Sequence, residues 1–184
     1  GSTAVTESQA NELTLTLTDA AVRPIQIWVR TAGVFNSARR TVAAVVPPAE
    51  GAFVKVGQRV RAFSLESRSS MYLATVSRIE QGSDGVTVSA TMAGPGHQGG
   101  VRYILEIVTE RGDFLSVPNE AIIETNGKQV VYVQEQQGRY MPREIQLGVQ
   151  GELYTQVLSG LKPGEQVVTF GSFFIDAEHK LKGS

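Results

Sequence analysis

Glycines at residues 94–99 form a pattern that is typical of phosphate-binding turns. Gly94, Gly96 and Gly99 match G-x-G-x-x-G, a spacing that lets backbone amides approach a pyrophosphate at the N-terminus of a helix. The residues that follow, Val101 to Val108, have a strand pattern, so no helix is expected there to supply the dipole. We interpret residues 94–99 as a glycine-rich hairpin loop and not as a dinucleotide site.

Candidate metal ligands and nucleophiles are few. Cysteine is absent, which excludes a Cys-ligated metal, a Cys nucleophile and a redox dithiol. The two histidines, His97 and His179, lie too far apart in sequence for a spaced metal motif. Met71, Met92 and Met141 have thioethers that suit Cu(I), but three methionines in a chain this long are more simply core residues. Spacing leaves a Ser-His-Asp triad open, although no serine stands in a G-x-S-x-G elbow.

These observations predict a protein without catalytic residues, cofactor or metal site. The 184 residues carry 17 Lys and Arg against 18 Asp and Glu, a net charge of −1 that argues against a dedicated nucleic-acid binder. A modest basic cluster is formed by Arg39-Arg40 with Arg59 and Arg61. It is explained either by a solvated strand face or by contact with an acidic protein partner. The single tryptophan, Trp28, is expected in core or inter-domain packing.

Alternation of apolar and polar residues dominates the chain and predicts strands. Leu13, Leu15 and Leu17 alternate with threonines, as in a half-buried strand. Asp84-Gly85 and Asn126-Gly127 are dipeptides of hairpin turns. Further strand patterns occur at Ile25–Val29, Thr41–Val46, Tyr72–Ile79, Val86–Met92, Val101–Val108, Val130–Val133, Ile145–Val149, Leu153–Leu158 and Val167–Phe170. This spacing favours an all-β fold, an antiparallel barrel or sandwich with little helix.

The ends of the chain have a different character from its middle. Gly1-Ser2 resembles a cloning scar, so a targeting signal at the natural start is left open. Residues 1–12 are expected to be a disordered leader. Phe173 to Leu181 have the spacing of one short amphipathic helix. A domain boundary is expected near Val117-Pro118, where proline interrupts a β pattern that then restarts.

Several short motifs occur in an order that resembles a known family. They are Val54–Val60, Ala74–Ile79, Val117–Ile123, Gly127–Val133, Ile145–Gly148 and Ser159–Val168. This series resembles the periplasmic adaptor subunits, or membrane fusion proteins, of tripartite RND-type efflux pumps. Residues 171–178 are particularly similar to the heavy-metal branch of that family. Their order and spacing carry the resemblance, because each motif alone is short and rich in Gly, Pro and Val.

The resemblance implies a specific domain organisation. It predicts a small antiparallel β-barrel domain at residues 23–116, inserted into a membrane-proximal β-domain made of residues 13–22 plus 117–182. The residues that carry the family motifs are expected to be structural: Gly57, Gln58, Val117, Pro118, Gly160, Leu161, Pro163 and Gly164. Arg59 and Arg61, which follow the first motif, are the predicted partner surface. Family members also insert a lipoyl-like domain and a long α-helical hairpin, whereas here residues 36–40 join two strand patterns directly. That insert was either engineered out or is naturally missing.

The function that the resemblance implies is non-catalytic. Such an adaptor lies in the periplasm, associated with the inner membrane, and docks as an oligomer on an inner-membrane RND transporter. It couples the transporter to an outer-membrane channel, a contact that the family makes through the hairpin that is missing here. The resemblance of the tail favours heavy-metal export. The alternatives are a periplasmic small-ligand or metal-binding β module, for which the Met and His residues are the candidates, and a β-barrel hydrolase using His97.

Overall fold

The computed structural model describes residues 3–4, 15–67, 70–94 and 100–170, and they form two compact units. The barrel unit comprises Ile27–Glu110, and the terminal unit comprises Gly1–Gln26 together with Arg111–Ser184. Two long strands, β3 (Ala21–Asn36) and β8 (Arg102–Pro118), contribute residues to both units. The expected tail helix, His97 and His179 lie outside the described residues.

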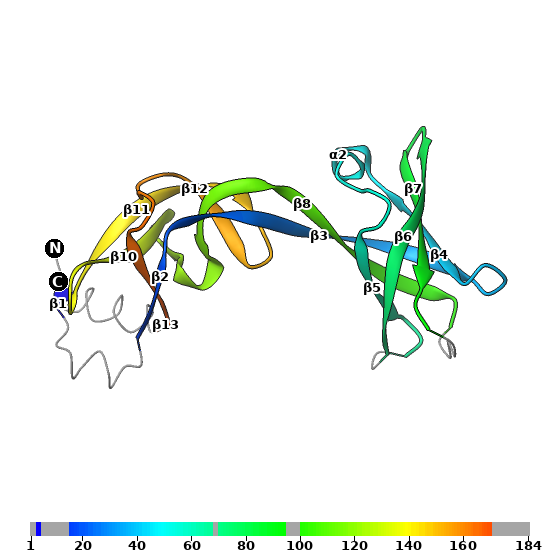
Figure 1. The fold of residues 1–184 in the computed structure, drawn as a ribbon, viewed down its shortest axis with the longest axis horizontal. Coiled ribbons are helices and arrows are strands. Elements are labelled where there is room, and N and C mark those ends of the chain that lie inside the picture. Colours follow the sequence, from blue (N-terminus) through cyan, green and yellow to red (C-terminus); the bar gives the residue numbers. More distant parts are fainter. Residues whose placement is uncertain (1–2, 5–14, 68–69, 95–99, 171–184) are drawn as a thin grey trace. The chain divides into compact units, whose positions relative to one another are not determined.

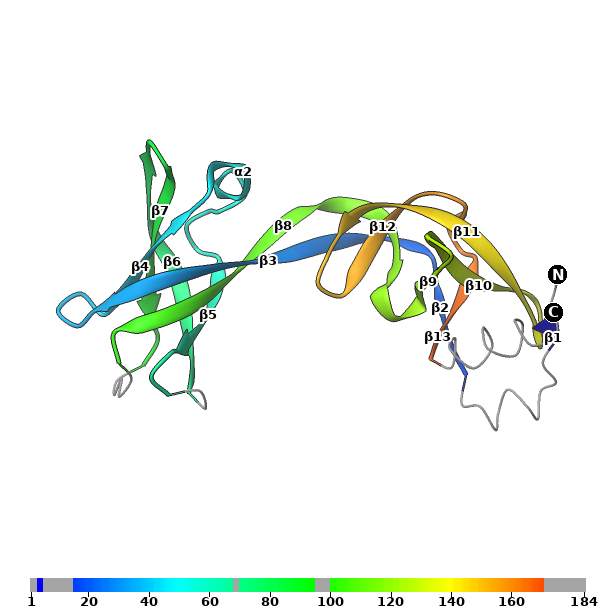
Figure 2. The ribbon, with the colours of Figure 1, turned by 180° about the vertical axis from the view of Figure 1, so that it is seen from behind.

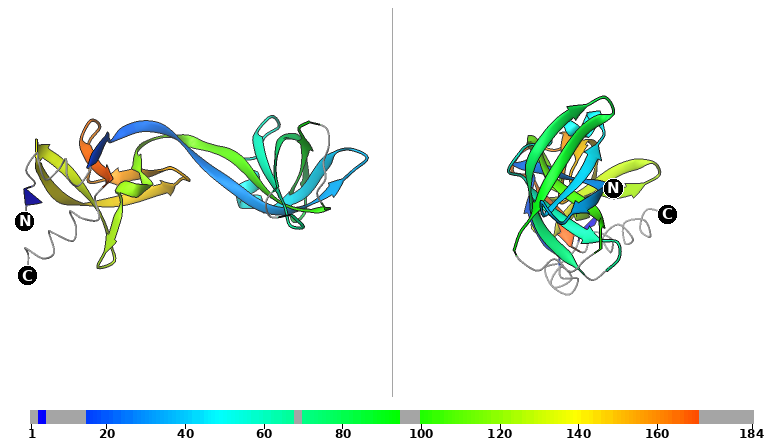
Figure 3. Two further views of the ribbon diagram at one scale, coloured as in Figure 1. Left: turned by 90° about the horizontal axis from the view of Figure 1, so that it is seen from below. Right: turned by 90° about the vertical axis from the view of Figure 1, so that its right-hand side faces the viewer.

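The barrel unit is a closed sheet of six antiparallel strands. Its order is β3-β4-β7-β6-β5-β8, and β8 pairs with β3 as well as with β5, which closes the sheet. A closed barrel leaves no strand edge exposed to other chains. Figures 1, 2 and 3 show these strands from four sides. The remaining elements of this unit are β4 (Thr41–Val46), the short α2 (Pro48–Gly51), β5 (Arg59–Ser64), β6 (Met71–Gly82) and β7 (Gly85–Met92).

Period-two alternation places small apolar side chains inside the barrel. On β4, Val42, Ala44 and Val46 are buried, whereas Ala43 and Val45 face outward. A six-stranded barrel is narrow, so valine and alanine fill most of it. The ring of Tyr103 belongs to the same core and contacts the rings of Phe35 and Tyr72 at centroid distances of 6.1 and 6.2 Å. The interior also contains Val29, Val60, Ala62, Val76, Val88, Ala90, Leu105 and Ile107.

The terminal unit joins both ends of the described chain in one sheet. Strand β2 (Thr16–Asp19) pairs with β13 (Gln166–Phe170), so that Val167 lies opposite Thr18. Figure 2 shows this pair beside β10. The other elements are β1 (Thr3–Ala4), the 3-10 turn η1 (Asn119–Ala121), β9 (Ile123–Thr125), β10 (Lys128–Gln136), β11 (Arg139–Gln150) and β12 (Tyr154–Ser159).

The structure confirms the predicted all-β class. It corrects the expected leader at two residues. Thr3–Ala4 form β1, which pairs with β11 opposite Tyr140 and Arg139, so these two residues are not part of an irregular leader. The other residues of the expected leader lie outside the described ranges. Within those ranges, no helix has both the length and the apolar character needed to cross a membrane.

Candidate docking surface

Gly57 and Gln58 shape the turn that leads into β5. Gly57 has a φ of +95°, a backbone conformation that side chains disfavour. The Gln58 side chain donates from Nε2 to the Phe53 carbonyl at 2.9 Å, and its Oε1 accepts from the Lys55 amide at 2.9 Å. Gln58 therefore satisfies backbone groups within the turn.

Val117 and Pro118 end β8 in the interior of the terminal unit. Both are buried, and they pair with Thr155 and Tyr154 of β12. The next residue, Asn119, donates to the Gly151 carbonyl at 2.9 Å and accepts from the Thr155 hydroxyl at 2.7 Å. Because proline lacks an N–H, Pro118 suits the last position of a strand, where the ladder stops.

The turn from Gly160 to Gly164 connects β12 to β13. Gly160 and Gly164 have φ values of +103° and +90°, and Leu161 between them is buried in the core. Ala20, just after β2, donates its amide to the Glu165 carbonyl and accepts from the Gly164 amide, both at 2.8 Å. The turn thus fastens the end of β2 to the start of β13.

Glu165 is held at this turn by an arginine. Arg143 Nη1 lies 2.7 and 2.6 Å from the two carboxylate oxygens of Glu165, and the Lys162 amide donates to Oε1 at 2.8 Å. Desolvation raises the pKa of Glu165, but the hydrogen bonds from Arg143 and Lys162 outweigh it and hold the pKa below its usual range. Gly160, Leu161 and Gly164 of this turn therefore shape or pack the junction of β12 and β13.

Arg61 belongs to a cluster on the outside of the barrel that we call the Glu106 cluster: Trp28, Arg30, Arg61 and Glu106. Glu106 Oε2 lies 2.7 Å from Arg30 Nε, and its Oε1 lies 2.8 Å from Arg61 Nη2. The Arg61 guanidinium covers the Trp28 ring at 4.1 Å from the centroid, a cation–π distance. The Glu106 side chain is only 10% exposed, whereas those of Arg30 and Arg61 are 54% and 36% exposed.

The two arginines predicted as the partner surface have different surroundings in the structure. Arg59 and Arg61 share the outward face of β5, and Arg59 is exposed. Arg61 is instead engaged by Glu106 and Trp28. Trp28, expected in core or inter-domain packing, is half-buried outside the core clusters, and the Arg61 guanidinium covers one face of its ring. Sequence reasoning also missed Arg30 and Glu106; the signal was a lone carboxylate within the apolar run of residues 103–108.

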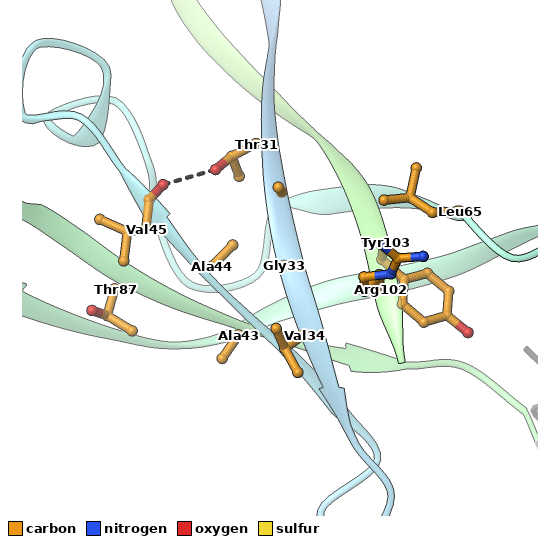
Figure 4. Close-up of a pocket in the computed structure, with 11 residues that line it drawn as sticks. Thr31, Gly33, Val34, Ala43, Ala44, Val45, Leu65, Thr87, Arg102 and Tyr103 are labelled. Atoms are coloured by element: carbon orange, nitrogen blue, oxygen red, sulfur yellow. Dashed lines mark hydrogen bonds between the residues drawn. The ribbon is translucent and has the colours of Figure 1, made fainter. Parts of the chain in front are cut away.

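An apolar hollow of about 520 Å³ lies on the barrel unit, and we call it the barrel groove (Figure 4). Small residues form much of its lining, and the residues Val34, Val45 and Leu65 are 60%, 52% and 47% exposed. The lining consists of Thr31, Ala32, Gly33, Val34, Ala43, Ala44, Val45, Leu65, Thr87, Arg102 and Tyr103.

Arg102, at the groove, is paired with Glu66. Its Nε lies 3.0 Å from Glu66 Oε1. The hydrogen bond from Arg102 lowers the pKa of Glu66.

The methionines do not converge. Met92 is buried in the barrel, Met71 is 49% exposed on the outside of the same unit, and Met141 belongs to the terminal unit. Among the described residues, no group of three or more His, Cys, Asp or Glu side chains is placed to hold a metal ion.

Comparison with protein families finds a match for the C-terminal part of the chain. Residues 115–176 match the family model for the CzcB C-terminal circularly permuted SH3-like domain. The chain is 38% identical over 84 residues to the nickel-cobalt-cadmium resistance protein NccB of Alcaligenes xylosoxydans xylosoxydans. It is 32% identical over 85 residues to the cation efflux system protein CusB of Escherichia coli K12. Each match covers 46% of this chain and 21% of the relative, so the chain spans about a fifth of the length of these relatives.

Two solved structures are also similar over 70% of this chain. They are ZneB from Cupriavidus metallidurans, with 21% identity, a TM-score of 0.36 and 39% of that chain covered, and MacA from Actinobacillus actinomycetemcomitans, with 25% identity, a TM-score of 0.44 and 41% covered.

Over its C-terminal part, this chain is therefore similar to proteins named for heavy-metal resistance and cation efflux. The resemblance that the motif series indicated is thereby confirmed for that part. A third relative, the nickel and cobalt resistance protein CnrB of Cupriavidus metallidurans, is 34% identical over 84 residues, with 46% of this chain and 21% of the relative covered.

Proposed function

We propose that this chain is the transporter-docking portion of a periplasmic adaptor for heavy-metal export. The observation that carries the proposal is the match of residues 115–176 to the CzcB C-terminal domain, together with relatives named for nickel, cobalt, cadmium and cation efflux. In this role the chain catalyses no reaction and forms no covalent bond. It acts in the periplasm beside the inner membrane by presenting complementary surfaces to an RND transporter, with copies of itself as neighbours.

Contact with the outer-membrane channel is a separate part of the proposal. In the described chain, β3 passes through a tight turn at residues 37–40 directly into β4, and Asn36 pairs with Thr41. A helical hairpin is thus not placed between these strands. Coupling to the channel would require a hairpin supplied from elsewhere, whereas docking on the transporter needs only the two β units.

Arg59 is the more available of the two arginines proposed for the partner surface. Its side chain points outward from β5 and is exposed, whereas Arg61 is engaged by Glu106. An acidic partner would therefore meet Arg59 first and Arg61 through its remaining exposed edge. Gly57, Gln58, Val117, Pro118, Gly160, Leu161 and Gly164 have a structural role in this proposal, because they hold the turns and strand ends described above. Pro163, at an exposed position of the last of these turns, is assigned the same role.

A binding titration tests the proposal. The chain is titrated with the periplasmic portion of the RND transporter encoded beside its gene. We expect saturable association with a Kd of about 1 µM or tighter, which corresponds to about −8 kcal/mol. Arg59→Glu should weaken this association, while the control Arg78→Glu, which changes an arginine paired with Glu80 on β6, should not. Absence of association up to about 1 mM, or about −4 kcal/mol, would contradict docking by these two units.

A further inference from the structure

The barrel groove opens where β3 leaves β4. Ladder pairs between the two strands run from Asn36 opposite Thr41 to Gly33 opposite Ala44, although β4 continues to Val46. Beyond that point the Thr31 hydroxyl donates to the Val45 carbonyl at 2.7 Å, as Figure 4 shows. A side-chain hydrogen bond thus replaces the ladder.

Gly33, which lies opposite the interior residue Ala44, lets β3 approach β4 closely beside the groove. A Cβ built at Gly33 would lie 2.6 Å from Val42 Cγ1 and 2.9 Å from the Ala43 carbonyl oxygen, so only glycine fits here. With Ala32 and Ala43 beside it, the floor is recessed between Val34 and Val45, both more than half exposed. An apolar hollow that remains open to water on a folded unit is typical of an interaction site.

Arginine side chains lie on the same face of β3 as this apolar floor. Successive outward residues of β3 lie on one face, so Trp28 and Arg30 of the Glu106 cluster precede Ala32 and Val34 of the groove. In the cluster Arg30 is exposed, Arg61 is partly exposed and the carboxylate is covered, so that a partner meets the positive groups.

The other end of the same strand is also basic. Beyond Val34, the turn after β3 carries Arg39 and Arg40, both exposed. Residues 27–110 contain nine Lys and Arg against six Asp and Glu, a net charge of +3, although the whole chain has −1. The charge of the barrel unit therefore selects an acidic partner.

We propose that the barrel groove holds an extended segment of the transporter that carries small aliphatic side chains next to an aspartate or glutamate. The aliphatic side chains occupy the floor at Ala32, Gly33 and Ala43, and the carboxylate meets the exposed edge of Arg30. A membrane surface fits less well, because apolar groups must protrude to enter a bilayer and this floor is recessed. This inference rests on the proposed function and assigns the part of the partner that this surface would bind.

Two variants change the groove without entering the barrel interior, since both positions face outward on β4. Ala43→Trp fills the floor, and Val45→Asp places a negative charge on an exposed rim position. The matched controls are Ala52→Trp and Val56→Asp, at exposed positions of the same unit outside the groove lining. Fluorescence of Trp28 reports the fold for Val45→Asp and Val56→Asp, and circular dichroism reports it for the tryptophan variants.

The probe is the same periplasmic portion of the transporter, titrated against each folded variant. Both groove variants should bind about tenfold more weakly or worse, as expected for changes at the centre of an interface, and both controls should bind like the unchanged chain. Unchanged affinity in the groove variants would overturn this inference and leave the proposed function standing. Failure of the unchanged chain to bind would overturn both.

A photo-crosslinker at Val45 identifies the occupant. We expect crosslinks to a transporter segment that contains aliphatic residues and an Asp or Glu. Crosslinks chiefly to a second copy of this chain would overturn the assignment to the transporter. Binding of the unchanged chain to phosphatidylglycerol vesicles would also overturn it, if the groove variants abolish that binding.

Discussion

Glu106 joins two arginines on the outer face of the barrel. Its nearly buried carboxylate accepts from Arg30 and Arg61, and Arg61 in turn covers Trp28. Glu106→Gln removes the negative charge that Arg30 and Arg61 share. We expect the barrel unit to lose about 1–3 kcal/mol, the usual cost of removing hydrogen bonds to charged groups. Denaturation followed by the fluorescence of Trp28 measures this loss.

The matched control for this prediction is Glu80→Gln. Glu80 pairs with Arg78 on β6, where both side chains are more than half exposed. Exposed pairs contribute little, so this change should cost about 0.5 kcal/mol or less. Equal effects of the two substitutions would mean that the Glu106 cluster does not stabilise the barrel.

Glu165 makes the terminal unit sensitive to acid. Its pKa is lower in the folded state than in the unfolded chain, because Arg143 and the Lys162 amide hydrogen-bond to the charged form. Its contribution is therefore complete above the unfolded value of about 4.3 and is lost as pH falls through the folded pKa. We expect Glu165→Gln to destabilise the terminal unit at pH 7 and to have a smaller effect near pH 3.

Hydrogen–deuterium exchange of residues 160–168 at the two pH values, corrected for intrinsic rates, measures this difference. The control is Glu144→Gln, because the Glu144 carboxylate makes a longer, exposed pair with Lys128 at 3.4 Å. Glu144→Gln should leave exchange in the turn unchanged at both pH values. An effect of Glu165→Gln that is equally large at pH 3 would show that the charge of Glu165 is not its cause.

At the scale of elements, local patterns predicted the strands that alternate cleanly. Thr41–Val46 is expected as a strand and is β4, because its alternate valines face the interior. The expected strand at Ile25–Val29 was too short, since β3 continues through Gly33 to Asn36. Glycine and alanine have weak strand propensity, and the pairing of β3 with β4 extends the strand regardless.

The candidate site was harder to predict than the strands. Arg30 and Glu106 stand 76 positions apart and meet only because β3 and β8 are neighbours in the barrel. The groove depends on the point where β3 leaves β4, which no short pattern encodes. Arg61 was identified from its place in a basic cluster, but its partner Glu106 was not.

The turn between β12 and β13 offers a prediction with its own internal control. Gly160 and Gly164 both have positive φ, but an added Cβ at Gly160 would lie 2.5 Å from the Glu144 carbonyl, whereas at Gly164 it meets nothing within 4 Å. Gly164→Ala should therefore cost only the backbone strain, about 1–2 kcal/mol. Gly160→Ala should cost about 1–3 kcal/mol more, because the neighbouring strand must move.

Thermal unfolding of the two variants, followed by circular dichroism, tests this order. Both substitutions add the same methyl group to the same turn, so any difference reports the contact with Glu144. If Gly164→Ala destabilises the protein as much as Gly160→Ala, crowding at β11 is not what requires glycine at position 160.

At the scale of the whole molecule, the terminal unit depends on a strand from the start of the chain. β2 pairs with β13, and Leu15 and Leu17 pack against Tyr132, Tyr140 and Val168. The barrel core draws on none of these residues. The predicted insertion of a barrel into a domain built from both ends therefore has a direct consequence for truncated chains.

Removal of residues 1–19 should loosen the terminal unit and leave the barrel folded. Without β2, strand β13 loses a partner on one side, and Tyr132 and Val168 become accessible to water. We expect amide exchange in residues 166–170 to accelerate at least about tenfold, which corresponds to about 1.4 kcal/mol, while denaturation reported by Trp28 in the barrel stays unchanged. Removal of residues 1–14 is the matched control, since it keeps Leu15, Leu17 and all of β2. Unchanged exchange in β13 after the longer truncation would show that the C-terminal domain folds without the first strand, and the insertion would then be wrong.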